Sequence, residues 1–225
     1  VCKSWKAMID DWARHQTVPD VRKISIFEYT SRSLKATFTL HGSTATRFRH
    51  VMRAVLDPNT KIESTNFLVP TVDMYFKYDC PSIDIIGAKL NISVESLWIG
   101  EGRIGAQNSK KFFENIRGML RSVKSVGTLS ITREIFTEDI ATSMSDLVKT
   151  FPVHEFKYHS EHGFIEDPRP FLLEIASKVK ICTFLQTQTK KNASFLGSEK
   201  LNWEELIESM FDRGANEIYL RNHAR

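Results

Sequence analysis

The stretch Val94-Glu95-Ser96-Leu97-Trp98-Ile99 has apolar residues at its first, fourth and sixth positions. The same spacing recurs beside segments with the apolar stripe of an amphipathic helix. The other copies are Val21-Ile24-Ile26, Val126-Leu129-Ile131, Val153-Phe156-Tyr158, Val179-Cys182-Phe184 and Ala215-Ile218-Leu220. From Val94 onward the copies follow one another at steps of roughly 30 residues, which indicates one supersecondary unit used many times.

Each of these strands is followed by a loop and then a helix from Val94 onward. Strands joined in this way are expected to be parallel, with right-handed crossovers. The predicted fold class is therefore α/β, a solenoid of strand–helix units with a parallel sheet on one side and helices on the other, preceded by one short N-terminal helix. Residues 60–92 are the least legible part, where Ile83, Ile85 and Ile86 suggest a further strand.

The strands alternate apolar and polar residues, so we expect helices to cover only one face of the sheet. The other face would carry large apolar groups such as Trp98 among Lys, Glu and Arg, a combination typical of protein-interface hot spots. Period-two alternation predicts the members of this partner-binding face. They are Phe27, Trp98, Ser130, Lys157, His159, Thr183, Leu185, Tyr219 and Arg221.

Composition restricts the class of protein. Of 225 residues, 41% are hydrophobic and 26% are charged, which argues against disorder. The net charge of +4 is mild, so no nucleic-acid partner is expected, and no apolar stretch approaches the roughly 20 residues that a membrane helix needs. Cys2, Cys80 and Cys182 form no C-x-x-C pair, which favours a reducing compartment, cytoplasmic or nuclear.

One motif points to an enzyme. Gly100-Glu101-Gly102-Arg103-Ile104-Gly105 matches G-x-G-x-x-G and follows a strand, as in dinucleotide-binding sites. However, the preceding strand contains Glu95 and Ser96, and the next helix is expected to begin only near Ser109. A loop between strand and helix explains the glycines equally well, and a dinucleotide-binding enzyme using the Gly100–Gly105 loop stays an alternative.

Three histidines, His154, His159 and His162, lie close together in the sequence. Strand alternation sends His154 and His159 to opposite faces, so the three are not expected to converge on a metal. The chain has no G-x-S-x-G motif and no recognisable cysteine-protease signature. The sequence therefore predicts no catalytic residue, metal or cofactor.

The run Val1-Cys2-Lys3-Ser4-Trp5-Lys6-Ala7-Met8-Ile9-Asp10 resembles the end of an F-box. With the units that follow, the chain is similar to F-box families expanded in nematodes, which carry an irregular leucine-rich-repeat-like region. The resemblance implies two parts. Residues 1–17 would be the C-terminal helix of an F-box-like motif, and residues 18–225 would be the leucine-rich-repeat-like domain. It implies adaptor binding by Val1, Cys2, Trp5, Met8 and Ile9.

This resemblance implies a non-catalytic substrate-recognition subunit of a Skp–cullin–F-box type E3 ubiquitin ligase. Its partners would be a Skp-family adaptor, the cullin ligase and an unknown protein substrate. A protein-interaction scaffold with no ligase link is the alternative, because strand–helix arrays bind partners in many contexts.

Overall fold

The computed structural model describes residues 7–8, 11–12, 21–41, 44–65, 69–100, 109–133, 137–160, 168–188 and 202–224. The strands are β1 (Val21–Thr30), β2 (Ser33–Leu40), β3 (Lys61–Thr65), β4 (Thr71–Lys77), β5 (Ser93–Gly100), β6 (Ser125–Arg133), β7 (Val153–Ser160), β8 (Ile181–Gln188) and β9 (Glu217–Ala224). The helices are α2 (Thr44–Val55), α3 (Pro81–Lys89), α4 (Ser109–Leu120), α5 (Glu138–Thr150), α6 (Arg169–Ala176) and α7 (Trp203–Asp212).

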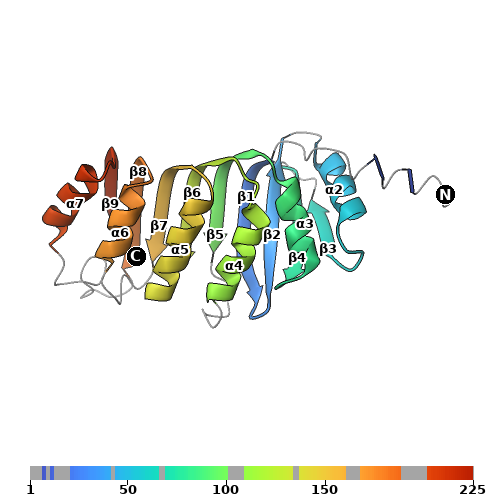
Figure 1. The fold of residues 1–225 in the computed structure, drawn as a ribbon, viewed down its shortest axis with the longest axis horizontal. Helices are drawn as coiled ribbons and strands as arrows, with labels where there is room; N and C mark the ends of the chain where they lie inside the picture. Colours follow the sequence, from blue (N-terminus) through green and yellow to red (C-terminus); the bar gives the residue numbers. More distant parts are fainter. Residues whose placement is uncertain are drawn as a thin grey trace.

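Within these ranges, the strands form one open sheet in the order β3-β4-β2-β1-β5-β6-β7-β8-β9. From β1 through β9 along this order, every neighbouring pair is parallel. The chain therefore adds one strand after another in a single direction from β5 onward (Figure 1). The expected α/β class with a mostly parallel sheet is confirmed.

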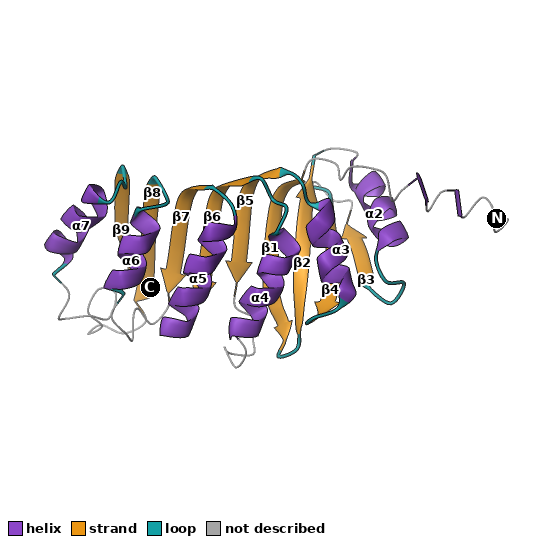
Figure 2. Cartoon of the chain, in the orientation of Figure 1, coloured by secondary structure: helices purple, strands orange, loops and turns teal. Residues whose placement is uncertain are grey.

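The helices lie in front of the sheet in Figure 2 and leave its other face uncovered by helix in the described chain. The repeated apolar positions point toward these helices and align across the parallel strands. One such row contains Ile24, Leu97, Leu129, Phe156, Cys182 and Ile218. The next contains Ile26, Ile99, Ile131, Tyr158, Phe184 and Leu220. Every member before β9 is fully or almost fully buried, so these rows form the contribution of the parallel strands to the core.

The odd spacing of the repeat has a structural cause. Val94 pairs with Val126 and Ser96 pairs with Thr128, so the register stays constant while one residue of each strand, Glu95 and Gly127, lies outside the pairing. A skipped residue inverts the alternation that follows it. The first and fourth positions of the motif can therefore both face the helices.

The predicted repeat does not extend evenly over residues 18–225. β2 pairs antiparallel with β1 and with β4, and β3 pairs antiparallel with β4. Only Ser31 and Arg32 separate β1 from β2, and a two-residue connection can join only antiparallel strands. The strand–helix alternation is regular from β5 onward.

The strand suggested by Ile83, Ile85 and Ile86 was wrong, because these residues lie in α3. Pro81 opens this helix at its first turn, where its missing N–H costs nothing. Ile83 and Ile86, three residues apart, are its buried isoleucines, while Ile85 is half-buried.

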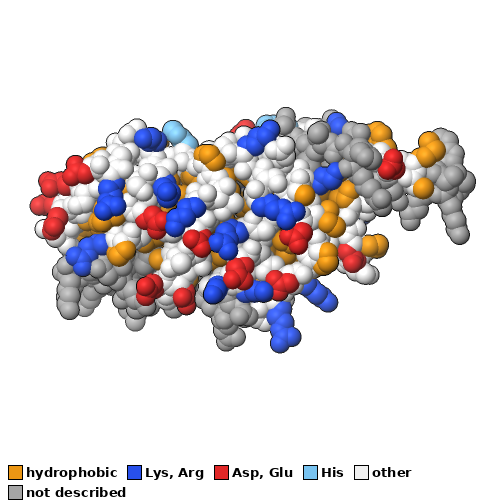
Figure 3. Space-filling view, viewed as in Figure 1, with side chains coloured by type: hydrophobic (Ala, Val, Ile, Leu, Met, Phe, Trp, Pro, Cys, Tyr) orange, Lys and Arg blue, Asp and Glu red, His pale blue; other side chains and the backbone are white. Residues whose placement is uncertain are grey.

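Ion pairs link the neighbouring helices from α3 to α6 along the front of the molecule. Arg121, in the turn directly after α4, contacts Asp84 of α3, with 3.2 Å between Nη1 and Oδ1. Arg117 of α4 contacts Asp146 of α5 at 2.9 Å, and Lys149 of α5 contacts Glu174 of α6 at 2.7 Å. Figure 3 shows the result, with acidic and basic side chains interleaved over the helices rather than gathered by sign.

Of the predicted N-terminal helix, the structure describes four residues, 7–8 and 11–12, and all are helical. Met8 and Trp12 are exposed, at 64% and 54%. Val1, Cys2, Trp5 and Ile9 lie outside the described residues. None of the described helices is both long enough and apolar enough to span a bilayer.

Candidate interaction surface

The candidate site is the sheet face opposite the helices, called here the open face. It is built from three rows of side chains that cross the six parallel strands in register. Row one contains Lys23, Ser96, Thr128, Glu155, Ile181 and Glu217. Row two contains Ser25, Trp98, Ser130, Lys157, Thr183 and Tyr219. Row three contains Phe27, Gly100, Thr132, His159, Leu185 and Arg221. All nine residues of the predicted partner-binding face lie in rows two and three.

The exposure of these residues is uneven. Tyr219 and Arg221, on the edge strand β9, are exposed. Thr183 is only 5% exposed and presents almost no surface, since longer side chains flank it in row two. The remaining six residues are half-buried. Period-two alternation predicted the side of the sheet on which each side chain lies, but not the solvent exposure of that side chain.

Trp98 does not stand out from the sheet as a lone apolar group. Its ring packs edge-on against Phe27, with ring centroids 4.5 Å apart, and its Nε1 donates to Thr132 Oγ1 at 3.1 Å. A Cβ at Gly100 would lie 2.9 Å from Trp98 Cη2. The ring therefore lies over Gly100, and the glycine provides the space for it.

The middle of the open face holds a polar network. Thr128 Oγ1 donates to Glu155 Oε2 at 2.9 Å, and Lys157 Nζ lies 2.9 Å from Glu155 Oε1. The carboxylate is thus held from both sides by neighbours in rows one and two. Such preset geometry lowers the entropy cost of presenting charge to a partner.

At the β9 end, Tyr219 Oη donates to Glu217 Oε2, and Arg221 lies over the Tyr219 ring at 5.6 Å from its centroid. The hydrogen bond to Glu217 raises the pKa of Tyr219, so the phenol stays protonated over the physiological range. At alternate positions along β9, the open face thus carries a carboxylate, an aromatic ring and a guanidinium group.

Sequence reasoning missed the other end of this face, on β1 through β4. Tyr29 packs edge-on against Tyr75 at 5.0 Å, and Lys61 Nζ lies 4.7 Å from the Tyr75 ring centroid. Burial lowers the pKa of Lys35, but the ion pair with Asp73 at 2.7 Å outweighs it, and the pKa is raised overall. The alternation of apolar and polar residues over 71–77 was the sequence signal that could have placed Asp73 and Tyr75 on this face.

A cavity of about 470 Å³ opens beside the pair Tyr29 and Tyr75, called here the aromatic corner. Tyr29, Tyr75, Lys61, Lys77 and Asp57 are among the residues that line it. Its walls are polar and aromatic, and Cys80 among them has a pKa raised by burial, which disfavours a reactive thiolate. The raised pKa therefore makes Cys80 a poor nucleophile, and the cavity adjoins the part of the open face formed by Tyr29 and Tyr75.

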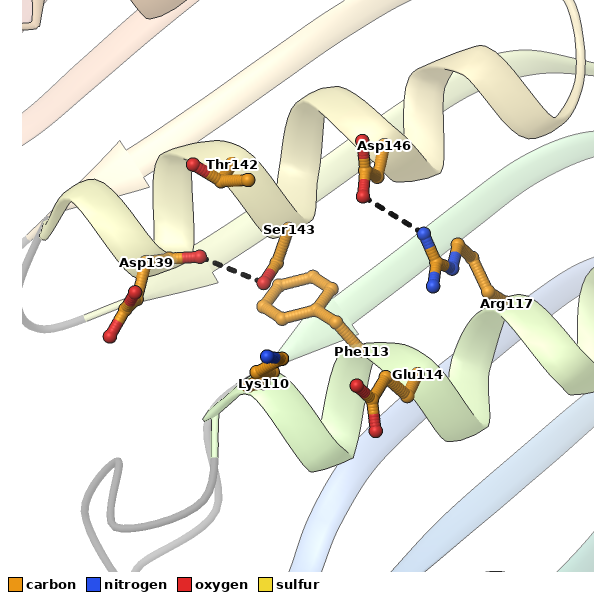
Figure 4. Close-up of a pocket in the computed structure, with 8 residues that line it drawn as sticks. All are labelled: Lys110, Phe113, Glu114, Arg117, Asp139, Thr142, Ser143 and Asp146. Atoms are coloured by element: carbon orange, nitrogen blue, oxygen red, sulfur yellow. Dashed lines mark hydrogen bonds and ion pairs between the residues drawn. The ribbon is translucent and has the colours of Figure 1, made fainter.

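The helix side has a smaller cavity, of about 130 Å³, between α4 and α5 (Figure 4). The Arg117–Asp146 ion pair bridges it, and Ser143 Oγ donates to the backbone carbonyl of Asp139. Lys110 and Glu114 border it on the α4 side. These contacts tie neighbouring helices together, and the serine bonds its own helix rather than a general base.

The structure adds no support for a dinucleotide site at Gly100–Gly105 or for a metal site at the three histidines. Gly100 has a packing role under Trp98, and residues 101–108 lie outside the described part of the chain. His159 lies in row three of the open face, whereas His154 is one of the residues at which the pairing skips. His162 lies outside the described residues. In the described ranges, no three His, Cys, Asp or Glu side chains are grouped to hold a metal ion.

Comparisons of the chain with protein-family models, curated proteins and solved structures found no match.

Proposed function

We propose that this chain is a non-catalytic binding module, the substrate-recognition subunit of a Skp–cullin–F-box type ubiquitin ligase, with a leucine-rich-repeat-like solenoid over residues 18–225. The observation that carries the binding role is the open face. Its three rows are aligned across six strands whose opposite side is packed against helices. A surface built on a sheet covered from behind changes little when a partner docks.

The size of the face suits a protein partner. Strands about 4.8 Å apart and about 17 Å of strand length give roughly 700 Å² for the nine-stranded sheet. A standard interface buries roughly 800 Å² on each partner. The aromatic pairs Phe27–Trp98 and Tyr29–Tyr75 supply the kind of residue that dominates binding energy at such interfaces.

Support for the ligase role comes from the resemblance of Val1–Asp10 to the end of an F-box. Met8, one of the residues implied to touch the adaptor, is helical and 64% exposed. An exposed methionine on a helix is suited to docking in an apolar groove of an adaptor.

The ligase role is tested by pull-down of the full-length protein with a Skp-family adaptor. We expect binding by the wild type and loss of binding with Trp5→Ala plus Ile9→Ala. Circular dichroism must show both proteins folded. Absence of binding by folded wild type would remove the ligase role and leave a protein-interaction scaffold.

The open face is tested separately by proximity labelling in cells. Lys157→Glu reverses the charge at the centre of row two, and we expect it to remove the partners that the wild type labels. Lys110→Glu makes the same change on α4, on the helix side, and should keep them. Equal loss from both variants would place the binding surface elsewhere.

A further inference from the structure

In the described chain, β9 pairs with β8 on one side and with no other strand. Its outer edge therefore presents a line of backbone N–H and C=O groups. An edge of this kind is a template for pairing with another strand unless it is shielded. β9 is eight residues long and contains no proline.

The core is also incomplete at this end. Ile218 and Leu220 are the β9 members of the two core rows, and both are only half-buried. Their neighbours in the same rows, Cys182 and Phe184, are 0% exposed. The last strand thus leaves apolar surface open where the inner strands have none.

Helix α7 adds to this apolar end. Leu206 and Met210 are its buried residues. Trp203, Ile207 and Phe211, four residues apart, form a stripe on one side of the helix, and Phe211 is 45% exposed. α7 and β9 lie at the end of the molecule opposite the N-terminus (Figure 1).

The sequence of β9 is complementary to itself. If two copies of Glu217-Ile218-Tyr219-Leu220-Arg221 pair antiparallel about Tyr219, Glu217 of each copy faces Arg221 of the other. Ile218 then faces Leu220 on the helix side, and Tyr219 faces its own equivalent on the open face. Opposite charges and paired aromatic rings directly across two strands both stabilise pairing. A two-fold interface requires this kind of self-complementarity.

We propose that β9 pairs antiparallel with β9 of a second copy of this chain, with Tyr219 on the two-fold axis. The axis stands perpendicular to the sheet, so the helices of both copies lie on the same side and the two α7 stripes approach the joint. The two open faces then form one continuous surface of twice the width. This inference does not depend on the ligase role.

Light scattering coupled to size-exclusion chromatography tests the pairing. We expect the wild type to be a dimer at about 100 μM. Arg221→Glu places like charges opposite Glu217 twice in each dimer, so the dissociation constant should rise by about tenfold or more. Adding Glu217→Arg restores both pairs and should restore the dimer. Lys23→Glu, the same charge change on the same face at β1, should leave it unchanged.

The register is tested by cysteine cross-linking. Residues directly opposite in an antiparallel pair have Cα atoms about 4.5–5.5 Å apart, within the range of a disulfide. Under mild oxidation, Tyr219→Cys should form a covalent dimer, and Arg221→Cys alone should not. Mixing Glu217→Cys with Arg221→Cys should cross-link them. A wild type that stays monomeric, or a dimer insensitive to Arg221→Glu, overturns the proposal.

Discussion

The indole ring of Trp98 packs edge-on against the phenyl ring of Phe27, with ring planes at 75°. The two residues come from β5 and β1, which are adjacent and parallel although three strands and two helices separate them in the sequence. The contact therefore fastens the antiparallel N-terminal part of the sheet to the repeated part, on the face that we assign to partner binding.

Replacing Trp98 with alanine should lower the free energy of unfolding by about 2 kcal/mol, because a half-buried ring and its hydrogen bond to Thr132 are lost. Tyr219→Ala removes a ring of the same row that is exposed in the single chain, and at protein concentrations low enough to keep the chain monomeric it should cost no more than about 0.5 kcal/mol. Urea unfolding followed by circular dichroism measures both. Equal losses would contradict the packing of Trp98 described above.

Gly100→Ala should displace the Trp98 ring without unfolding the chain. The new methyl group would lie 2.9 Å from Trp98 Cη2 and 3.2 Å from Phe27 Cδ1, so the rings must shift. We expect a changed near-ultraviolet circular dichroism spectrum and a stability loss of about 1 kcal/mol. In a Trp98→Leu background the same change should cost much less, and a double-mutant cycle would measure the difference.

The parallel strand order from Val94 onward follows from one motif, because equal spacing in each copy aligns equal positions across neighbouring strands. The same alignment places Phe27, Trp98 and Tyr219 on one face. Ile83, Ile85 and Ile86 were misread because a short apolar run fits a strand as well as a buried helix. Pro81 was the missed signal of a helix start.

The exposure of Thr183 and the position of the Trp98 ring could not be predicted. Alternation fixes only the side of the sheet to which a residue points. Whether Thr183 reaches water depends on the side chains beside it in adjacent strands, and where the indole lies depends on the space over Gly100. Both are properties of neighbours far apart in the sequence.

Gly87→Ala should be among the most damaging single changes in the helix layer. A Cβ at Gly87 of α3 would lie 2.1 Å from the backbone carbonyl oxygen of Gly118 in α4. Backbone cannot move aside as a side chain can, so we expect a loss of about 3 kcal/mol in unfolding free energy. Gly118→Ala is the matched control, because its nearest neighbour in that position is Ile83 Cγ2 at 3.4 Å.

In the control, helix propensity should dominate, and Gly118→Ala should be neutral or stabilising by up to about 1 kcal/mol. Chemical denaturation of both variants checks the pair. Similar losses for Gly87→Ala and Gly118→Ala would show that α3 and α4 do not cross as closely as described.

Cys182 should resist alkylation in the native protein. Its side chain lies in a core row, and burial raises the pKa of its thiol to about 12. At pH 8 almost none is thiolate, and the reagent must also reach a site that is 0% exposed. Iodoacetamide labelling and peptide mass spectrometry should find Cys182 unmodified until the chain is unfolded, and modified fully afterwards. Labelling of Cys182 in the native chain would contradict its burial.

The Lys149–Glu174 pair should make stability fall in acid. The hydrogen bond that Glu174 accepts from Lys149 lowers the pKa of Glu174 below its value in the unfolded chain. The pair therefore stabilises the fold above the unfolded value of about 4.3, and the contribution is lost as the pH falls through the folded pKa. Glu174→Gln should be less stable than wild type at pH 7 and equal to it at the lowest pH.

Glu208→Gln, at an exposed position on α7, serves as control. Urea midpoints of all three proteins across pH 2 to 7 measure this, and a gap between Glu174→Gln and wild type that persists in acid would contradict it.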